Sequence, residues 1–363
     1  MRTAWTILAL PSISGCWKDD LAEIPPDVLQ FQPEIEAPPG WLVAPVAVDL
    51  ACPDGEDGRF YVVYPESAAE EGAAPISAAV VYHSGSFDFV FAPDPSDPLA
   101  GTHYSDPPRL TAAWAIDQVF VTLGMYPELD AVEVHDGSLP VALAEQGIAM
   151  MIPANCWGDL WANKPGSTDN DFASDFFFRE GKAAAEWSYR FLVDPAFAAA
   201  FDVELPFAVD PASVYAIGLG EGSRGVAELL AIDNDADGTP DFTVAGALVD
   251  APFDDLRVYF ADSGLYASTI EGLTRIYPAG VDATEAGSLW SARLPDRFGV
   301  VASTADPVWP SELVDPLLGR LGPSQWASVV SDPVHIRTNG GGDPDLARTA
   351  VEYLVTGVVP TVR

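Results

Sequence analysis

Residues 233–241 have a spacing of acids that suits a hard metal ion. Carboxylates occupy positions 1, 3, 5 and 9 of this stretch, and glycine occupies position 6, where the chain must bend sharply. Calcium takes six to eight oxygen ligands, and a backbone carbonyl can supply one of them. The sequence therefore predicts a structural Ca²⁺ site whose ligands are Asp233, Asp235, Asp237, Thr239 and Asp241. The alternative is an acidic turn that binds no ion.

A second informative stretch is 214–222, in which an apolar run ends in alternating glycines, Gly218, Gly220 and Gly222. This pattern predicts a strand, a sharp turn and the start of a helix. It resembles the nucleophile elbow of the α/β-hydrolase family, which needs small residues two positions before and two after the nucleophile. Gly220 stands where the family carries serine.

Other stretches resemble landmarks of the same family in the same order, over roughly residues 41–357. Asp306 matches the acid of the catalytic triad. The stretch 338–343 precedes the last helix, and Gly342 or Asp343 occupies the position of the catalytic histidine. The resemblance implies an oxyanion region formed by His83, Ser84, Gly85 and Glu221.

Glycine cannot attack a carbonyl, so loss of the nucleophile and the base together removes acyl-enzyme chemistry. The sequence therefore predicts a non-catalytic relative that binds a ligand or a partner. One alternative is an active esterase- or peptidase-like hydrolase that uses Ser223, with Glu221 then in the tight position two residues earlier. Such an enzyme would need a histidine, with His335 as the candidate, that also meets Asp306 or Asp250. The other alternative is a structural envelope lipoprotein.

The N-terminus has the parts of a secretory signal, because Arg2 precedes an apolar run at 4–10. The tetrapeptide Ile13-Ser14-Gly15-Cys16 resembles the lipobox of bacterial lipoproteins. The resemblance implies a signal peptide at 1–15, lipidation of Cys16, and a bacterial membrane as partner, at the periplasmic or cell surface. The alternative is an unprocessed N-terminal strand or helix. The proline-rich segment 16–40 is expected to be a tether.

Export would leave Cys52 and Cys156 in an oxidising compartment, where an even pair can form a disulfide. The alternative is two buried thiols. No H-E-x-x-H or C-x-x-C spacing supports zinc, and we expect no organic cofactor.

The chain from 41 to 363 alternates strand and helix patterns, which predicts an α/β-hydrolase-like three-layer sandwich with a mostly parallel sheet and an N-terminal hairpin. Strands are predicted at 41–50, 59–64, 76–83, 148–153, 214–218, 243–249, 298–303 and 327–331. Helices are predicted at 110–124, 139–146, 176–192, 222–232, 311–320 and 344–355. Insertions at 92–108 and 155–175 are expected to form a lid or binding surface, or alternatively a packed aromatic loop.

The composition excludes one class of partner. The 363 residues contain 17 Lys and Arg against 54 Asp and Glu, a formal net charge of −37. Nucleic-acid binding needs clustered cations, so it is not expected. Hydrophobic residues nevertheless make up 48% of the chain, enough for a core, so the acidity does not predict disorder. It suits an exported protein in a calcium-bearing milieu.

Overall fold

A computed structural model describes residues 37–51, 57–82, 138–154, 181–233, 237, 239–252, 290, 293–306, 314–331, 336–338, 343 and 345–360. The predicted signal peptide, most of the tether, the three cysteines, both insertions and the predicted helix at 110–124 lie outside these residues. No helix in the described ranges is long and apolar enough to cross a bilayer.

The described strands form one eight-stranded sheet in the order β1-β2-β4-β3-β5-β6-β7-β8. Its strands are β1 (Trp41–Ala51), β2 (Asp57–Pro65), β3 (Ile76–Tyr82), β4 (Ala149–Ala154), β5 (Val209–Leu219), β6 (Gly246–Asp250), β7 (Phe298–Ser303) and β8 (Trp326–Val330). β1 and β2 form an antiparallel hairpin, and β2 also pairs antiparallel with β4. The remaining pairs are parallel. The predicted mixed sheet with an N-terminal hairpin is therefore confirmed.

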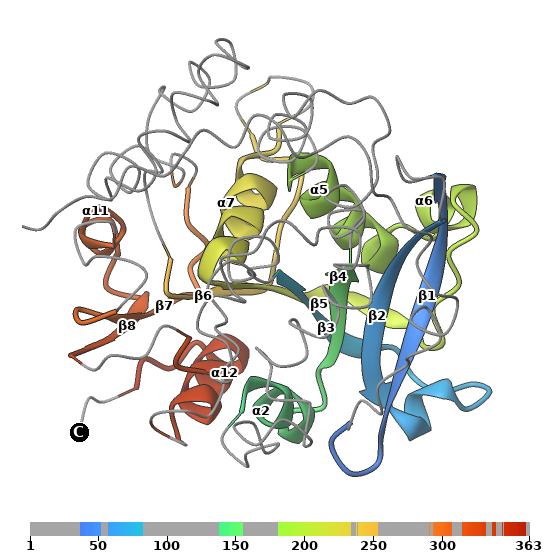
Figure 1. The fold of residues 1–363 in the computed structure, drawn as a ribbon, viewed down its shortest axis with the longest axis horizontal. Helices are drawn as coiled ribbons and strands as arrows, with labels where there is room; N and C mark the ends of the chain where they lie inside the picture. The colour runs from blue at the N-terminus through green and yellow to red at the C-terminus, as the bar shows by residue number, and fades with distance from the viewer. Residues whose placement is uncertain are drawn as a thin grey trace, which may run out of the picture.

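Helices cover both faces of this sheet (Figure 1). The helical elements are η1 (Glu66–Ala69), α2 (Leu139–Glu145), α5 (Gly181–Val193), α6 (Pro195–Ala200), η6 (Gly220–Gly222), α7 (Ser223–Ala231), α11 (Asp315–Leu318) and α12 (Leu346–Thr356). Figure 1 shows α5, α6, α7 and α11 on one face and α2 with α12 on the other. The arrangement has the three layers that the sequence predicts.

The two faces of the sheet bury separate apolar clusters. On the α5 and α7 face, alternate strand residues such as Val80 and Ala216 pack against Val226 and Leu230 of α7. On the opposite face, Ile217 and Leu248 pack against helix residues that include Leu354. Strands buried on both faces read as continuous apolar runs, which explains the pattern Gly-Ala-Leu-Val that begins β6.

Several predicted boundaries needed correction. Residues 243–245 precede β6 and are not strand, and α11 covers four residues where the sequence predicts ten. The predicted helix at 222–232 begins as the short η6 turn before α7. The sequence analysis did not predict α6, although ordinary helix-start signals are present. The Asp194 side chain accepts hydrogen bonds from two backbone N–H groups of the first turn, and Pro195 is the first residue of the helix.

Candidate functional site

The parallel strands β3, β5, β6 and β7 end at one edge of the sheet, and this edge holds the candidate site. Tyr82 pairs with Gly218, Leu219 pairs with Asp250, and Asp250 pairs with Val301, so the ends of these strands lie in register. In open α/β sheets, ligands bind outside the carboxyl ends of the strands. We call this the carboxyl edge.

β5, η6 and α7 form a tight strand-to-helix turn at this edge, as the glycine spacing predicts. Gly218 lies so close to the first turn of α7 that an added Cβ would come within 2.5 Å of the Cα of Ser223. Real Cβ atoms essentially never approach another atom this closely, so position 218 requires glycine.

Gly220 occupies the apex of the turn with a φ of 54°, in the left-handed region. An L-residue pays about 1–2 kcal/mol for this conformation, whereas glycine adopts it without a steric penalty. Gly220 is also buried. The geometry of an elbow is thus present at a residue that has no side chain.

Ser223 lies beneath the turn rather than at its apex. Its side chain is fully buried, and its Oγ donates a hydrogen bond of 3.4 Å to the carbonyl oxygen of Gly218. The side chain of Glu221, the neighbouring candidate for the oxyanion region, lies outside the described residues.

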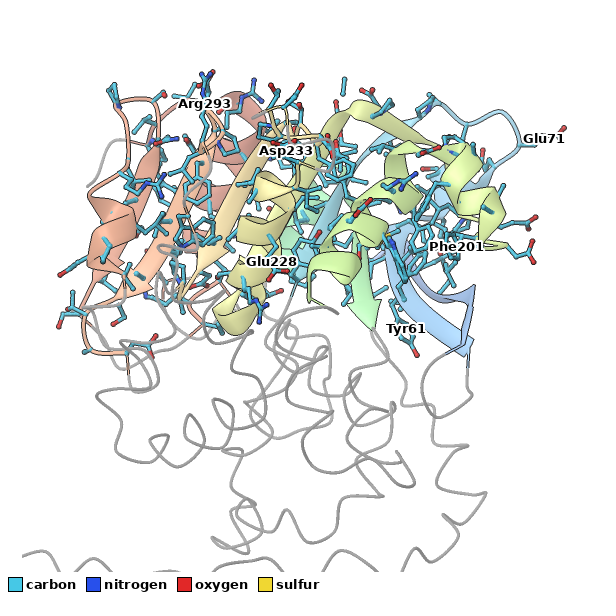
Figure 2. The ribbon with its side chains drawn as sticks, turned by 90° about the horizontal axis from the view of Figure 1, so that it is seen from above. Tyr61, Glu71, Phe201, Glu228, Asp233 and Arg293 are labelled. Atoms are coloured by element: carbon cyan, nitrogen blue, oxygen red, sulfur yellow. The ribbon has the colours of Figure 1, made fainter. Side chains whose placement is uncertain are left out.

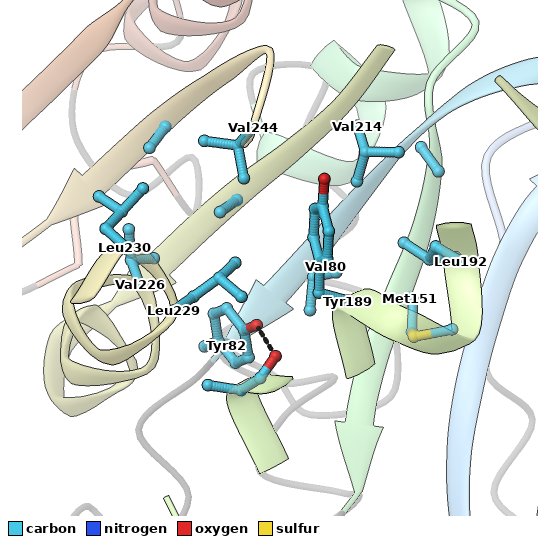
Figure 3. Close-up of a cluster of buried hydrophobic side chains, with 14 of the residues drawn as sticks. Val80, Tyr82, Met151, Tyr189, Leu192, Val214, Val226, Leu229, Leu230 and Val244 are labelled. Atoms are coloured by element: carbon cyan, nitrogen blue, oxygen red, sulfur yellow. Dashed lines mark hydrogen bonds between the residues drawn. The ribbon is translucent and has the colours of Figure 1, made fainter. Parts of the chain in front are cut away.

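Tyr82 of β3 contacts Gly225 of α7 next to the turn, and no local sequence pattern predicts this contact. An added Cβ at Gly225 would lie 2.7 Å from the Tyr82 ring, so only glycine admits the ring at this distance. The Tyr82 hydroxyl donates to the carbonyl oxygen of Ala185 in α5 at 2.9 Å (Figure 3). Burial raises the pKa of Tyr82 well above its usual value, with a further contribution from the Glu228 carboxylate. Tyr82 therefore stays neutral and acts as a packing and hydrogen-bonding residue.

The predicted oxyanion residues His83, Ser84 and Gly85 follow Tyr82 directly in the sequence but lie outside the described residues, as does His335. Of the two candidates at the histidine position, Gly342 also lies outside. Asp343 is exposed, and its Oδ1 accepts a hydrogen bond of 3.0 Å from the backbone N–H of Asp345.

Asp306 follows β7 and is partly buried at the carboxyl edge. Two hydrogen bonds shape the turn that leads to it. Thr304 N–H donates to the Val330 carbonyl at 2.8 Å, and Ala305 N–H donates to Ser303 Oγ at 3.1 Å. Asp306 thus follows the strand that pairs with β6, and its assignment as a triad acid stays a prediction.

Asp250, at the end of β6, holds the loop before α12 directly. Its Oδ2 accepts hydrogen bonds from Arg337 N–H at 2.8 Å, Thr338 N–H at 2.7 Å and Thr338 Oγ1 at 2.8 Å. The side chain is fully buried. Sequence reasoning named Asp250 only as an alternative partner for a base, because these contacts join positions 87 and 88 residues apart.

The described residues of the acidic loop 233–241 lie away from the carboxyl edge. α7 begins at that edge and runs back across the sheet, so the loop that follows it reaches the opposite edge, where Figure 2 shows Asp233. Asp237 N–H donates to Asp233 Oδ1 at 3.1 Å, and Thr239 N–H donates to Asp237 Oδ1 at 2.7 Å. Asp235 is outside the described residues, among which no group of three or more His, Cys, Asp or Glu side chains is placed to hold a metal ion.

No protein-family model matches this chain, and no curated protein matches it. Solved structures do resemble it. An inhibited form of esterase B from Lactobacillus rhamnosis aligns with a TM-score of 0.51 at 12% identity, over 89% of this chain and 88% of the esterase. An acylaminoacyl peptidase from Pyrococcus horikoshii aligns with a TM-score of 0.50 at 12% identity, over 89% of this chain and 43% of the peptidase.

Oligopeptidase B from Leishmania major aligns at 15% identity and a TM-score of 0.46, over 88% of this chain and 37% of the oligopeptidase. This chain therefore spans about two fifths of the length of these peptidases. Together with the sheet topology, the comparisons show an α/β-hydrolase-like fold. At these identities they show the fold alone.

Proposed function

We propose that this α/β-hydrolase-fold chain is a non-catalytic protein that binds a small molecule, a glycan, a peptide or a protein partner at its carboxyl edge. One observation carries the proposal: Gly220, with its φ of 54°, stands at the apex of the turn. In a hydrolase elbow the apex residue is the nucleophile. Here the geometry of the turn is kept and the attacking group is missing.

The position of Ser223 supports the same proposal. A serine nucleophile needs an Oγ that a substrate can reach and that a base can deprotonate. Ser223 is fully buried, and its Oγ donates to a backbone carbonyl. The alternative of an active hydrolase would require this turn to open.

Turnover of a short-chain ester tests the proposal. We expect the purified wild-type protein to hydrolyse p-nitrophenyl acetate or butyrate no faster than the variant Ser223→Ala or a heat-unfolded sample at equal concentration. A wild-type rate above background that Ser223→Ala abolishes would contradict the proposal and favour the active alternative.

The proposal extends to the cellular setting. Cleavage before Cys16 and lipidation of its side chain would anchor the protein to a bacterial membrane, with residues 16–40 as tether, at the periplasmic or cell surface. Feeding an alkyne-labelled palmitate to bacteria that express the full chain should label the wild type and not Cys16→Ser. Equal labelling of both, or labelling of neither, would remove the lipid anchor from the account.

Two further features belong to this setting. A disulfide between Cys52 and Cys156 would staple the domain in an oxidising compartment. Calcium held by Asp233, Asp235, Asp237, Thr239 and Asp241 would have a structural role. Support for this role comes from the position of the loop, at the edge opposite Gly220.

A further inference from the structure

A single buried carboxylate, that of Asp250, binds the backbone of residues 337 and 338. Asp250 Oδ2 accepts three hydrogen bonds from the loop 336–338, two from backbone N–H groups and one from the Thr338 hydroxyl. Thr338 is fully buried and Arg337 is 4% exposed, so little water reaches the loop to replace these bonds. Loss of the carboxylate would leave buried donors without an acceptor, which is costly.

The backbone next to Asp250 is strained. Ala251 has a φ of 52°, and apart from Asp202 it is the one residue other than glycine with a positive φ in the described ranges. Ala251 is buried, and its N–H donates to the carbonyl oxygen of Val301 at 2.9 Å. A strained backbone conformation persists only where the surrounding contacts hold it in place. Such residues are often found at functional sites, where side chains must be precisely positioned. Here the strained conformation sets the direction in which the chain leaves β6 immediately after Asp250.

The same loop is also hydrogen-bonded to the start of helix α2. The carbonyl oxygen of Thr338 accepts a hydrogen bond of 2.8 Å from the N–H of Leu139, the first residue of α2. Because Asp250 pairs with Leu219, which directly precedes Gly220, the chain of contacts begins beside the apex of the turn. It thus connects the end of β6, the loop before α12 and the start of α2.

We propose that Asp250 is a positioning residue that fixes the loop 336–338 as a preformed wall of the carboxyl edge. In the resemblance to hydrolases, this stretch leads to the position of the catalytic base. Here a carboxylate binds the loop backbone itself, which preorganises the edge for binding. The inference rests on the proposed function only in taking the carboxyl edge as the binding edge.

Amide hydrogen exchange of the folded full chain tests the proposal with three variants. Asp250→Ala removes all three hydrogen bonds, and Thr338→Val removes one of them at nearly constant shape. Thr338→Ser keeps the hydroxyl and is the matched control. The probes are the amides of residues 337 and 338, and the reference amides are those of β5 and β6 that bond to neighbouring strands.

We expect Asp250→Ala to accelerate exchange of the loop amides by about tenfold to a hundredfold relative to the reference amides, since hydrogen bonds to charged groups are strong. Thr338→Val should accelerate it by several-fold, and Thr338→Ser should restore the wild-type rates. Loop amides that exchange at wild-type rates in both Asp250→Ala and Thr338→Val would overturn the proposal. If Asp250→Ala exchanges all amides at one rate through global opening, Thr338→Val decides: selective acceleration of the loop supports the proposal, and its absence overturns it.

This test reads the order of the loop without any ligand or substrate. A positive result together with ester turnover would leave Asp250 as a positioning residue and overturn only the non-catalytic function. Unchanged exchange of the loop amides without ester turnover would overturn the role of Asp250 and leave the non-catalytic function standing.

Discussion

At the scale of single residues, Gly220 connects the glycine pattern in the sequence with the proposed non-catalytic function. The alternation of glycines at 218, 220 and 222 predicts a tight turn from the sequence alone, and the positive φ of Gly220 places the apex of the turn at the middle glycine. Gly218 and Gly220 are required at their positions for different physical reasons. Gly218 makes room for the backbone of Ser223, whereas Gly220 adopts a conformation that strains other residues.

We therefore expect Gly220→Ala to lower the free energy of unfolding by about 1–2 kcal/mol, the cost of a left-handed L-residue. Gly218→Ala should cost about 3 kcal/mol or more, because backbone atoms must move to admit its Cβ. Gly322→Ala is the control, since its added Cβ would meet only the Gln325 side chain at 3.7 Å. Urea unfolding measures all three. A Gly220→Ala variant as stable as Gly322→Ala would show that the apex is not strained.

A second prediction at this scale concerns Ala251. Relief of its left-handed strain gains about 1–2 kcal/mol, and the added freedom of glycine in the unfolded chain costs about 0.5–1 kcal/mol. Ala251 is buried, so removing its methyl group costs about 0.8 kcal/mol more. Ala251→Gly should therefore change the free energy of unfolding by less than about 1 kcal/mol. Ala247→Gly, within β6 and just as buried, has no positive φ to relieve and should lower it. Chemical denaturation that finds both variants equally destabilised would argue against strain at Ala251.

Contacts between residues far apart in the chain could not be predicted from the sequence. Asp250 contacts a loop 87 residues further along the chain, and Gly225 of α7 admits the ring of Tyr82 of β3. Neither contact leaves a local pattern. The elbow could be predicted because its constraint lies within nine consecutive residues.

At the scale of elements, hydrophobic periodicity predicts the described strands well, because buried parallel strands form continuous apolar runs. It also predicts the helices α5, α7 and α12. The residues at which helices and strands begin and end are less predictable. α11 ends after four residues at Gly319, and β5 extends five residues before the predicted start at 214 because Ile76 of β3 pairs with Val209. Such extensions depend on the neighbouring strand and not on local sequence.

α2 and α12 are joined across their exposed sides by an ion pair. Arg348 Nε and Nη2 donate to the two carboxylate oxygens of Glu145 at 2.8 and 2.9 Å. The hydrogen bond from Arg348 lowers the pKa of Glu145 below its usual value of 4.5, with the Arg348 charge adding to the shift. Both side chains are more than one third exposed, so the pair contributes less than about 1 kcal/mol after solvent screening.

Since the folded-state pKa of Glu145 is lowered, its contribution to stability is present above pH 4.5 and is lost as the pH falls through the folded-state value. Glu145→Gln should cost a few tenths of a kcal/mol at pH 7. This difference from wild type should shrink as the pH falls below 4.5 and through the folded-state pKa of Glu145. Glu70→Gln, at an exposed acid that forms no ion pair within the described ranges, controls for loss of one charge. Thermal unfolding from pH 3 to 8 measures the stability difference between the wild type and Glu145→Gln. A difference that does not change with pH would contradict the ion pair.

At the scale of the whole molecule, the net charge of −37 creates strong repulsion among acids in the folded chain. Calcium bound at 233–241 would relieve part of that repulsion at the edge opposite Gly220. We expect 1 mM EDTA to lower the melting temperature by a few degrees, the shift that corresponds to about 2–3 kcal/mol for an ion at a hundred times its Kd.

Asp237→Asn should abolish the calcium-dependent shift, whereas Glu71→Gln changes the charge equally outside the loop and should retain it. Magnesium at the same concentration controls for screening of the surface charge. A melting temperature unaffected by EDTA in the wild type would show that the loop binds no stabilising ion.

The fold of the molecule is α/β-hydrolase-like, and the central claim is that it has no nucleophile, because glycine stands at the apex of its turn. The most direct test is intact-mass spectrometry of the wild-type protein after incubation with excess fluorophosphonate. The account predicts no mass increase, with an active serine hydrolase as positive control. A stoichiometric adduct that is absent in Ser223→Ala would contradict the account and identify an active enzyme.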